Sequence, residues 1–538
     1  MKKIKYILAC SLMMMGLVSL NSCDENLDID ISKELEVNYF GSEYRITQGI
    51  GGAYAEITNI YGADLNNGTK HGFWLLPGDD VTSDGSGNSL ETFAGLSGGN
   101  GPVVNMWRTY YKVISRCNFM LEKIEEPTVA AIYKTPGLKD ANKAEMLFIR
   151  SWCNFKLWDN WRKAPLQIKR ITSAADAILP PSKDFELLDN AIASLEEAAP
   201  LANEAWNDLN TGRITKDACY GLLVKLYVTR ACYNSKNADD YSKAITAYGK
   251  ISADRIAAFS SVAYGESFDY RTENNAESLF EFQASIQPAG QDNAWLDNDF
   301  GGDVGQMAAF FHYSDSHWGN YSSGIFGPSQ KLIEAFDDND PRKAETLSNN
   351  ADNVGWSAWW ITPTWDRFLG YQLVKYNNGK RGNIVDPMWQ IGSNNNPRLL
   401  RMADVKLCVA EAYLATGNAG AALVQVNDVR QRARFSTSDG TEASAPAALA
   451  SVTITEIMNE RLLELAGEDG HRWSDLRRWH SAGYINLATW TPADFGFPAQ
   501  YDASLFKFDI SKHLLFPIPT EELDRNPEMA ASGQNPGY

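Results

Sequence analysis

The sequence lacks the residue patterns on which most metal and redox sites depend. In 538 residues it has only 7 cysteines and 6 histidines. No cysteines stand in a Cys-x-x-Cys pair, and no histidines stand in a His-x-x-His or His-Glu-x-x-His arrangement. The glycine-rich segments carry no lysine of the phosphate-binding-loop kind. The sequence therefore offers no zinc motif, no disulfide framework and no phosphate loop.

Basic residues are also scarce. The chain has 49 lysines and arginines against 67 aspartates and glutamates, which gives a formal net charge of −18. Nucleic acids bind surfaces rich in lysine and arginine because their phosphates are anionic. The charge balance argues against nucleic acid as a partner, and it disfavours an anionic ligand unless a local basic pocket departs from the average.

The apolar run near the N-terminus, residues 7–20, is too short for a membrane span. It follows Lys2, Lys3 and Lys5, and a basic start before a short apolar run is typical of a secretory signal. We therefore expect residues 1–22 to be a signal peptide that is not part of the fold.

The signal ends in Leu20-Asn21-Ser22-Cys23, which resembles a bacterial lipobox. Cleavage before Cys23 would let its thiol carry a diacylglycerol, whose acyl chains anchor the protein in a membrane. Residues 23–38 would then form a lipidated polar tether. The alternative is a chance cysteine beside an ordinary cleavage site.

Five cysteines remain beyond the signal and the lipobox, and each stands among apolar residues of a helical pattern. An odd number without paired spacing favours buried free thiols that act as small hydrophobic side chains. These are Cys117, Cys153, Cys219, Cys232 and Cys408.

Helical periodicity dominates the rest of the chain. In residues 103–125 and 139–161, apolar side chains recur every three or four residues, which predicts amphipathic helices. Residues 222–251 and 407–433 place small residues between aromatic ones, as tetratricopeptide hairpins do. Their spacing departs from a regular repeat of about 34 residues. We expect a mainly α fold of irregular tetratricopeptide-like hairpins that form a platform, with few short strands, one of them in the alternating residues 279–287.

The stretch 453–479 predicts a charged helical hairpin. Thr453 and Glu456 have the spacing of a capping box, which starts the first helix, and Gly467 and Gly470 favour a turn before a second helix that carries Trp473. Arginines and carboxylates at such spacing can join packed helices. We interpret the hairpin as a structural ion-pair network because no nucleophile or metal motif accompanies it. Its ten charged residues are Glu456, Glu460, Arg461, Glu464, Glu468, Asp469, Arg472, Asp475, Arg477 and Arg478.

This hairpin resembles the C-terminal signature of the SusD/RagB family of outer-membrane nutrient-binding lipoproteins. The matching residues are Glu460-Arg461, Gly470, Arg472-Trp473, Asp475-Leu476, Arg477 and the later run Leu514-Leu515-Phe516-Pro517-Ile518-Pro519. The resemblance implies that residues 39–538 form a single SusD-like α-helical domain. It also implies a lipoprotein on the surface of a Gram-negative outer membrane, where it would cap a SusC-like TonB-dependent transporter and hand oligosaccharide or polysaccharide to it.

Two loop-rich insertions, about 62–102 and 288–397, are rich in Gly, Asn and Asp, and the second also contains a helical pattern over 329–336. Aromatic rings in such loops suit neutral sugars, because a pyranose face covers a ring while its hydroxyls need donors and acceptors at the edge. The alternative is that these rings fill cores. The resemblance favours a glycan-binding arc of aromatic side chains. The candidates are Trp74, Trp295, Trp318, Tyr321, Trp356, Trp359 and Trp360.

Two acid-rich runs have oxygen ligands of the kind that calcium prefers. They are Asp79, Asp80, Asp84 and Asn88, and Asp297, Asn298, Asp299 and Asp303. Neither run has EF-hand spacing, so we interpret both as solvated turns and expect no cofactor. We expect a binding protein and not an enzyme. The alternatives are a glycan hydrolase, whose carboxylates need only meet in space, and a peptide-binding or interaction scaffold of the tetratricopeptide kind.

Overall fold

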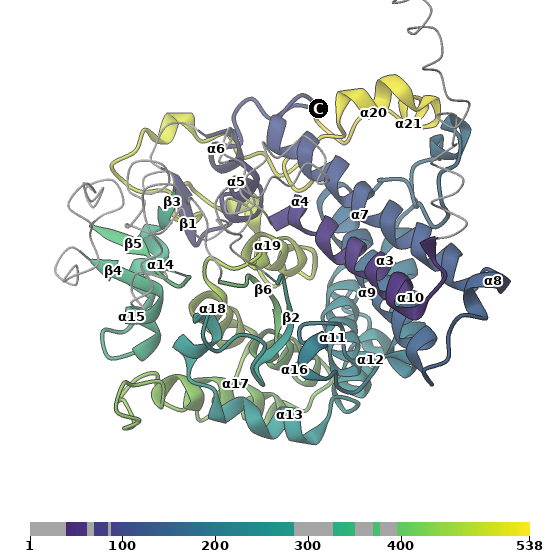
Figure 1. The fold of residues 1–538 in the computed structure, drawn as a ribbon. Helices are drawn as coiled ribbons and strands as arrows, with labels where there is room; N and C mark the ends of the chain where they lie inside the picture. Colours follow the sequence, from purple (N-terminus) through teal and green to yellow (C-terminus); the bar gives the residue numbers. More distant parts are fainter. Residues whose placement is uncertain (1–38, 62–68, 84–87, 284–325, 350–369, 377–394) are drawn as a thin grey trace, which may run out of the picture.

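The computed structural model describes residues 39–61, 69–83, 88–283, 326–349, 370–376 and 395–538. The expected signal peptide, the lipidation at Cys23 and the tether lie outside these residues. The described chain is mainly helical with few short strands, as the sequence predicts (Figure 1). Within it, no helix combines the length and the apolar character that a membrane crossing requires.

The longest helices pack side by side in the N-terminal half. Helix α7 (Gly101–Glu125) begins where the Asn100 side chain accepts a hydrogen bond from the Val103 N–H, and it buries Trp107 and Ile114 along one face. It packs against α3 (Glu43–Glu56) and α9 (Leu138–Trp161), and α9 packs on α10 (Glu186–Leu201) (Figure 1). The two strong helical patterns of the sequence are thus confirmed.

Helical hairpins continue through the second half of the platform. Helix α11 (Lys216–Tyr233) packs on α12 (Ala238–Tyr248), and α16 (Met402–Ala415) packs on α17 (Ala419–Arg434). Helix α16 also packs on both α11 and α12. Fully buried Ala244, Ala410 and Ala422 lie in these hairpins, where small side chains let helices approach closely. The predicted tetratricopeptide-like platform is confirmed.

The C-terminal hairpin forms as predicted. Helix α18 (Ile454–Leu465) starts with the capping box of Thr453 and Glu456, and α19 (His471–Ser481) follows Gly470, whose φ is +65°. The other α-helices in the described residues are α4 (Thr58–Tyr61), α5 (Thr69–Leu75), α6 (Ser89–Thr92), α8 (Pro127–Ala130), α13 (Ala253–Ala258), α14 (Gln330–Ala335), α15 (Pro341–Thr346), α20 (Thr520–Arg525) and α21 (Pro527–Ser532).

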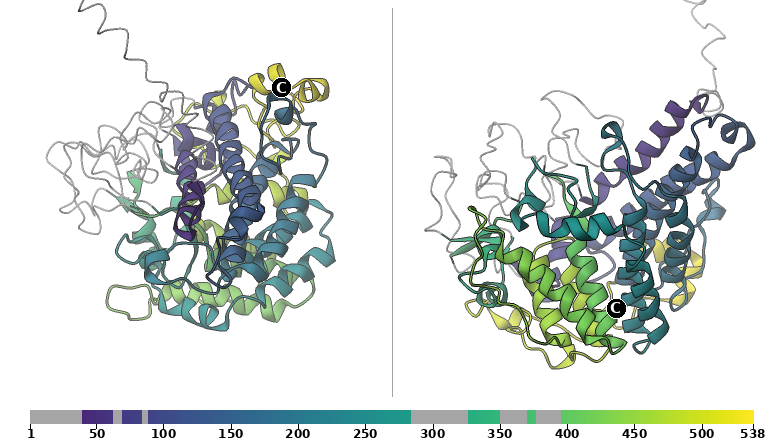
Figure 2. Two further views of the ribbon diagram at one scale, coloured as in Figure 1. Left: turned by 45° about the vertical axis from the view of Figure 1, so that its right-hand side comes forward. Right: turned by 90° about the horizontal axis from the view of Figure 1, so that it is seen from below.

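The described strands form three antiparallel pairs. They are β1 (Val81–Ser83) with β3 (Phe326–Pro328), β2 (Ser278–Glu281) with β6 (Arg398–Arg401), and β4 (Leu347–Asn349) with β5 (Tyr371–Leu373). Figures 1 and 2 show that β1, β3, β4 and β5 gather with α14 and α15 on the side of the molecule away from α9 and α10.

Three expectations can be compared with this picture. The helical pattern at 329–336 is confirmed as α14, capped by the Ser329 side chain. The five cysteines beyond the lipobox are free and buried, as expected. The segment 62–102 is more ordered than its composition predicts, since its described residues include α5, β1 and α6. The apolar run from Phe73 to Leu76 is buried, and burial of such a run favours a helix despite the surrounding glycines.

Candidate functional site

The three strand pairs join segments at the ends of the tryptophan-rich insertion, residues 288–397, or within it. In the β2–β6 pair, Glu281 lies opposite Arg398, so the chain leaves the platform and returns to it at the same place. Within the insertion, Asn349 of β4 lies opposite Tyr371 of β5. Ser83 of β1 lies opposite Phe326 of β3, which brings the N-terminal loop region beside the insertion. The framework therefore fixes the bases of the loops that carry the candidate sugar-binding rings.

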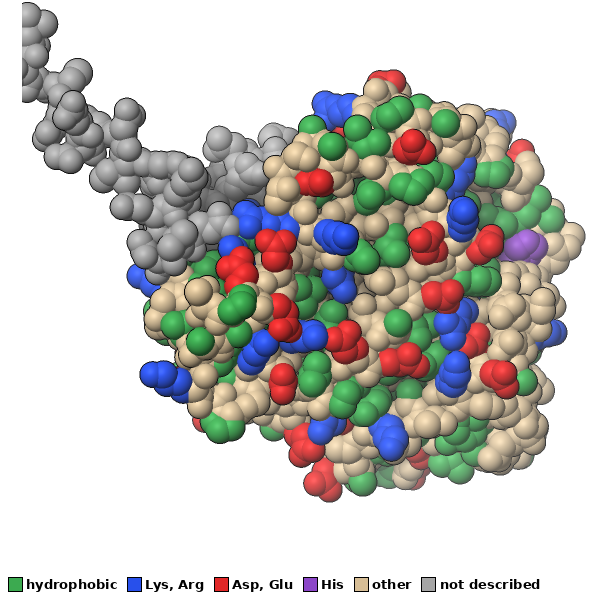
Figure 3. Space-filling view, turned by 90° about the vertical axis from the view of Figure 1, so that its right-hand side faces the viewer, with side chains coloured by type: hydrophobic (Ala, Val, Ile, Leu, Met, Phe, Trp, Pro, Cys, Tyr) green, Lys and Arg blue, Asp and Glu red, His purple; other side chains and the backbone are tan. Residues whose placement is uncertain are grey.

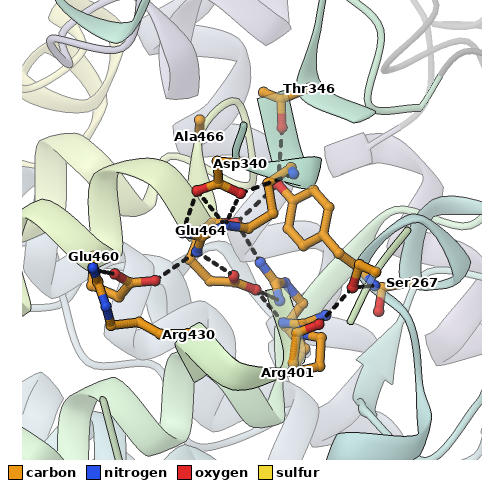
Figure 4. Close-up of polar contacts among 12 residues, drawn as sticks. Ser267, Asp340, Thr346, Arg401, Arg430, Glu460, Glu464 and Ala466 are labelled. Carbon is orange, nitrogen blue, oxygen red and sulfur yellow. Dashed lines mark hydrogen bonds and ion pairs between the residues drawn. The ribbon is translucent and has the colours of Figure 1, made fainter. Parts of the chain in front are cut away.

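A buried ionic cluster lies among these strands and the C-terminal hairpin, with Glu464 of α18 at its centre (Figure 4). One Glu464 oxygen accepts hydrogen bonds from Arg401 Nη1 at 2.6 Å and from Arg432 Nη2. The other accepts from Arg342 Nη1 at 3.0 Å. Burial raises the pKa of Glu464, but the three guanidinium groups outweigh that effect and hold the pKa well below its usual range.

Further pairs extend the cluster to the strand ends. Arg401, the last residue of β6, also donates to Glu277 at 2.6 Å and to Glu468 at 2.7 Å. Lys375, which follows β5, donates to Glu468 at 2.8 Å and to the Ala466 carbonyl at 2.7 Å. Carboxylates of the C-terminal hairpin thus bind the basic residues beside β5 and β6 and hold the base of the insertion.

The hairpin network is structural, as the sequence indicates, but its partners are mostly distant in the chain. Arg461 and Asp475 do join α18 to α19, with Nε 2.7 Å from Oδ2. Arg478 forms a bidentate ion pair with Glu411 of α16, in which Nη1 donates to Oε2 and Nη2 donates to Oε1, both at 2.6 Å. Each of these arginines is at most 2% exposed, and its charge is matched by a buried carboxylate.

Asp79 and Asp80 of the first acid-rich run are buried, which corrects the expectation that this run is a solvated turn. Asp79 is fully buried and pairs with Arg472 and with Lys331, whose Nζ lies 2.6 Å away. Asp80 is 3% exposed and accepts a hydrogen bond from the Gly467 N–H at 2.8 Å. The two carboxylates therefore bind an arginine, a lysine and a backbone N–H inside the fold. Asp84 and the run at Asp297, Asn298, Asp299 and Asp303 lie outside the described residues.

The buried Asp80 carboxyl predicts that the unfolding free energy depends on pH. Burial raises the pKa of its carboxyl to about 6, although the Gly467 N–H opposes the shift. A raised pKa means that the folded state holds the proton more tightly than the unfolded state, so ionisation costs stability as pH rises from about 4 to about 6. We expect the Asp80→Asn variant to lack this loss. Relative to the parent, its unfolding free energy should improve by roughly 3 kcal/mol between these pH values. Denaturant titrations of both proteins at several pH values would measure it, and a constant difference would contradict the assignment.

The structure describes one of the seven candidate aromatic residues, and it places that residue in the core. Trp74 is 4% exposed and stacks on Tyr61 with ring centroids 5.3 Å apart. Its Nε1 donates to the Tyr110 hydroxyl at 3.4 Å. This corrects the expectation that the Trp74 ring is available to a sugar. Trp295, Trp318, Tyr321, Trp356, Trp359 and Trp360 lie outside the described residues.

The described part of the chain contains no group of three or more His, Cys, Asp or Glu side chains arranged to hold a metal ion. The helical face of the molecule lies on the right of Figure 1, and Figure 3 shows that face from the front. Acidic and basic side chains of the described residues alternate across it, without a large patch of one charge. Such a surface does not resemble the continuous basic stripe that phosphate backbones require.

Sequence reasoning overlooked a cavity beside the turn between α10 and α11. Its volume is about 420 Å³, and Trp206, Asn207 and Arg213 are among the residues that line it. The signal was present in the sequence as a tryptophan among Asn203, Asn207 and Asn210, outside both insertions.

Two family models match this chain. A model described as "SusD family" matches residues 362–538, and one described as "Starch-binding associating with outer membrane" matches residues 25–228. A SusD-like protein, P25, from Formosa agariphila is 22% identical over 96% of this chain and 97% of its own length.

Solved structures share the fold. A SusD homolog from Bacteroides thetaiotaomicron aligns with a TM-score of 0.69 at 20% identity, covering 96% of this chain and all of the homolog. A structure titled "Laminarin binding SusD-like protein" aligns with a TM-score of 0.69 at 19% identity, covering 92% of this chain and 100% of its own. From the two model matches, the full-length relative and the shared fold, we conclude that this chain is a SusD-like protein.

Proposed function

We propose that this protein is a cell-surface lipoprotein that binds oligosaccharide or polysaccharide and delivers it to a SusC-like TonB-dependent outer-membrane transporter. Binding would occur on the aromatic rings of the insertion, and the helical platform would hold them in place. The family description links such chains to starch binding and to the outer membrane. Two structures with this fold are titled as laminarin-binding and as "Surface glycan-binding protein A" from Bacteroides uniformis.

One observation in this chain carries the proposal. Seven of its sixteen tryptophans lie in residues 288–397, and the two ends of that segment are held by the β2–β6 pair and by the cluster around Glu464. A segment built only to connect two strands needs neither so many indole rings nor so firm a base. Loops that bind ligands do need a rigid base, because fixed loops lose less conformational entropy when a ligand binds.

The rival functions make different predictions for one experiment. A glycan-binding protein migrates more slowly in a native gel that contains its polysaccharide. It releases no sugar from that polysaccharide. A glycan hydrolase releases product, and a peptide-binding scaffold does neither. We would run the chain from residue 24 onward in gels that contain laminarin or starch, with bovine serum albumin as the control for pore effects, and assay each polysaccharide for reducing ends. Retardation without product supports the proposal. Product release contradicts it in favour of the hydrolase, and unchanged migration in both gels contradicts the glycan ligand.

The anchor is a separate part of the proposal. Lipid on Cys23 would place the binding face beside a transporter in the same membrane, which raises the local concentration of one for the other. Labelling cells with a radioactive fatty acid would test it. The full-length protein should carry the label and remain in the membrane fraction, and an unlabelled protein would contradict the anchor.

A further inference from the structure

The cavity at the α10–α11 turn has a tryptophan that is held in a fixed position. Trp206 precedes the short helix η3 (Asp208–Asn210), and its Nε1 donates to the Ile214 carbonyl at 2.8 Å. The Arg213 guanidinium carbon lies 3.7 Å from the centre of the indole ring and covers one face. The ring is half-buried and also lines the cavity, so it presents an ordered apolar surface to it.

Arg213 is itself fixed by buried partners. Its Nε donates to Glu145 at 2.9 Å, and its Nη2 donates to Asn142 at 2.8 Å. Glu145 is fully buried in α9 and also accepts a hydrogen bond from the Tyr54 hydroxyl at 2.5 Å. The positive charge of Arg213 is therefore neutralised behind the ring, and the stacked pair is positioned before any ligand arrives.

The lining of the cavity suits an uncharged ligand with many hydroxyl groups. Among the described residues no carboxylate side chain lines it, although the protein has a formal net charge of −18. The side-chain amides of Asn203, Asn207 and Asn210 line it instead. Amides and hydroxyls both donate and accept, as sugar hydroxyls require. The remaining apolar lining comes from Pro136, Leu138 and Ala205, and the polar lining includes Thr47, Thr135, Asn203, Asn207 and Asn210.

The size of the cavity agrees with this chemistry. Its volume of about 420 Å³ lies within the range of about 300–1,000 Å³ that is usual for small-molecule sites. Three separate parts of the fold build it: α3, the start of α9, and the α10–α11 turn. Glu43 of α3 holds the second part in place by accepting hydrogen bonds from the Lys134 and Thr135 N–H groups, both at 2.6 Å.

We propose that this cavity is a second saccharide-binding site, in which a neutral sugar ring packs against Trp206 and the surrounding amides bind its hydroxyls. None of the lining residues belongs to the insertion. The choice of a saccharide as the ligand rests in part on the proposed function. Two sites on one protein would let a polysaccharide chain bind at both, which strengthens the retention of long chains beyond that of short ones.

Fluorine NMR on protein labelled with 5-fluorotryptophan tests the site directly. The Trp206→Phe variant identifies the Trp206 signal by its loss from the spectrum. We would titrate laminarihexaose, maltohexaose, cellohexaose, xylohexaose and mannohexaose, and we expect at least one of them to shift the Trp206 signal. If none of these five shifts that signal, the proposal is wrong. Shifts confined to other tryptophans overturn the second site and leave the proposed function standing, whereas a shift of Trp206 alone supports the second site and contradicts the insertion as the binding surface.

A pair of variants on the same turn gives an independent readout. We expect Trp206→Ala to weaken retention by the polysaccharide about tenfold while the affinity of the insertion for a short oligosaccharide is unchanged. Leu209→Ala is the matched control, because Leu209 lies on the same turn, is 95% exposed and does not line the cavity. Equal retention of both variants would overturn the proposal. Thermal melts show whether each variant is folded, and if Trp206→Ala unfolds, the more conservative Asn203→Leu takes its place with the same expected loss.

Discussion

Replacing Glu464 by Gln should cost about 3 to 5 kcal/mol of unfolding free energy, because the change leaves buried arginines without their shared counter-charge. Glutamine has nearly the same shape, so the packing of α18 is kept and the loss is mainly electrostatic. Arg342, Arg401 and Arg432 all donate to this carboxylate, and each is at most 2% exposed. Water cannot reach these guanidinium groups to compensate them in the folded protein.

The matched control is Glu442→Gln. Glu442 pairs with Arg434 at 2.7 Å, but its side chain is 52% exposed, and surface pairs of this kind contribute about 1 kcal/mol or less. Denaturant unfolding of the parent and both variants at neutral pH would measure the difference. If Glu464→Gln costs no more than the control, the cluster is not what holds the base of the insertion.

Replacing Trp473 by Ala should also cost about 3 to 5 kcal/mol, because the indole would leave a large cavity in the core. Trp473 lies in α19 and is 3% exposed. Its ring packs against Phe93 and Phe508, with centroid distances of 5.7 and 6.3 Å, and the Arg477 guanidinium lies 5.2 Å from its centre. The sequence predicted a structural role for this hairpin, and the burial of Trp473 supports it.

Tyr44→Ala is the control for the loss of an aromatic ring. Tyr44 is 69% exposed on α3, so its removal should change the unfolding free energy by no more than about 0.5 kcal/mol. Thermal and denaturant melts of both variants would be compared with those of the parent. A Trp473→Ala melt that matches the parent would show that the ring contributes little to the packing between α19 and the C-terminal segment.

The platform could be predicted from the sequence because its signals are local. The three- and four-residue periodicity of α7 and α9 lies within each helix, and so does the capping box at Thr453 and Glu456. A helix that buries one face shows that face in its own sequence, whatever it packs against.

The ionic partners could not be predicted, because they meet only in the folded chain. Asp79 and Arg472 are 393 residues apart, and Arg342 and Glu464 are 122 apart. Charges on a helical pattern were expected to join the two neighbouring helices, yet most of them bind residues of other elements, among them Arg342 of α15, Arg432 of α17 and Asp159 of α9. The solvated-turn interpretation of Asp79 and Asp80 failed for the same reason, since composition does not reveal a buried partner.

Aromatic residues were the least predictable part of the site. Trp74 lies in a glycine-rich segment, which suggested an available ring, but the adjacent Phe73 and Leu75 place it in a buried helix. Trp206 lies in a short turn that the sequence analysis passed over, and it lines a cavity. In each case the surroundings of the ring in the fold decide whether it is available, and they include residues from other parts of the sequence: Tyr110 beside Trp74, and Thr47 and Thr135 in the cavity that Trp206 lines.

The most direct test of the central claim is to replace Trp318 and Trp359 by Ala, singly and together, and to measure glycan retention beside thermal stability. The strand pairs and the Glu464 cluster that hold the insertion are built from described residues, and both tryptophans lie outside these residues. Each lost stacking contact should cost on the order of 1 kcal/mol, so the double variant should bind about tenfold more weakly or worse, with an unchanged melt. A collapsed melt would assign these rings to the core, and unchanged retention with an intact fold would contradict the insertion as the surface that binds glycan.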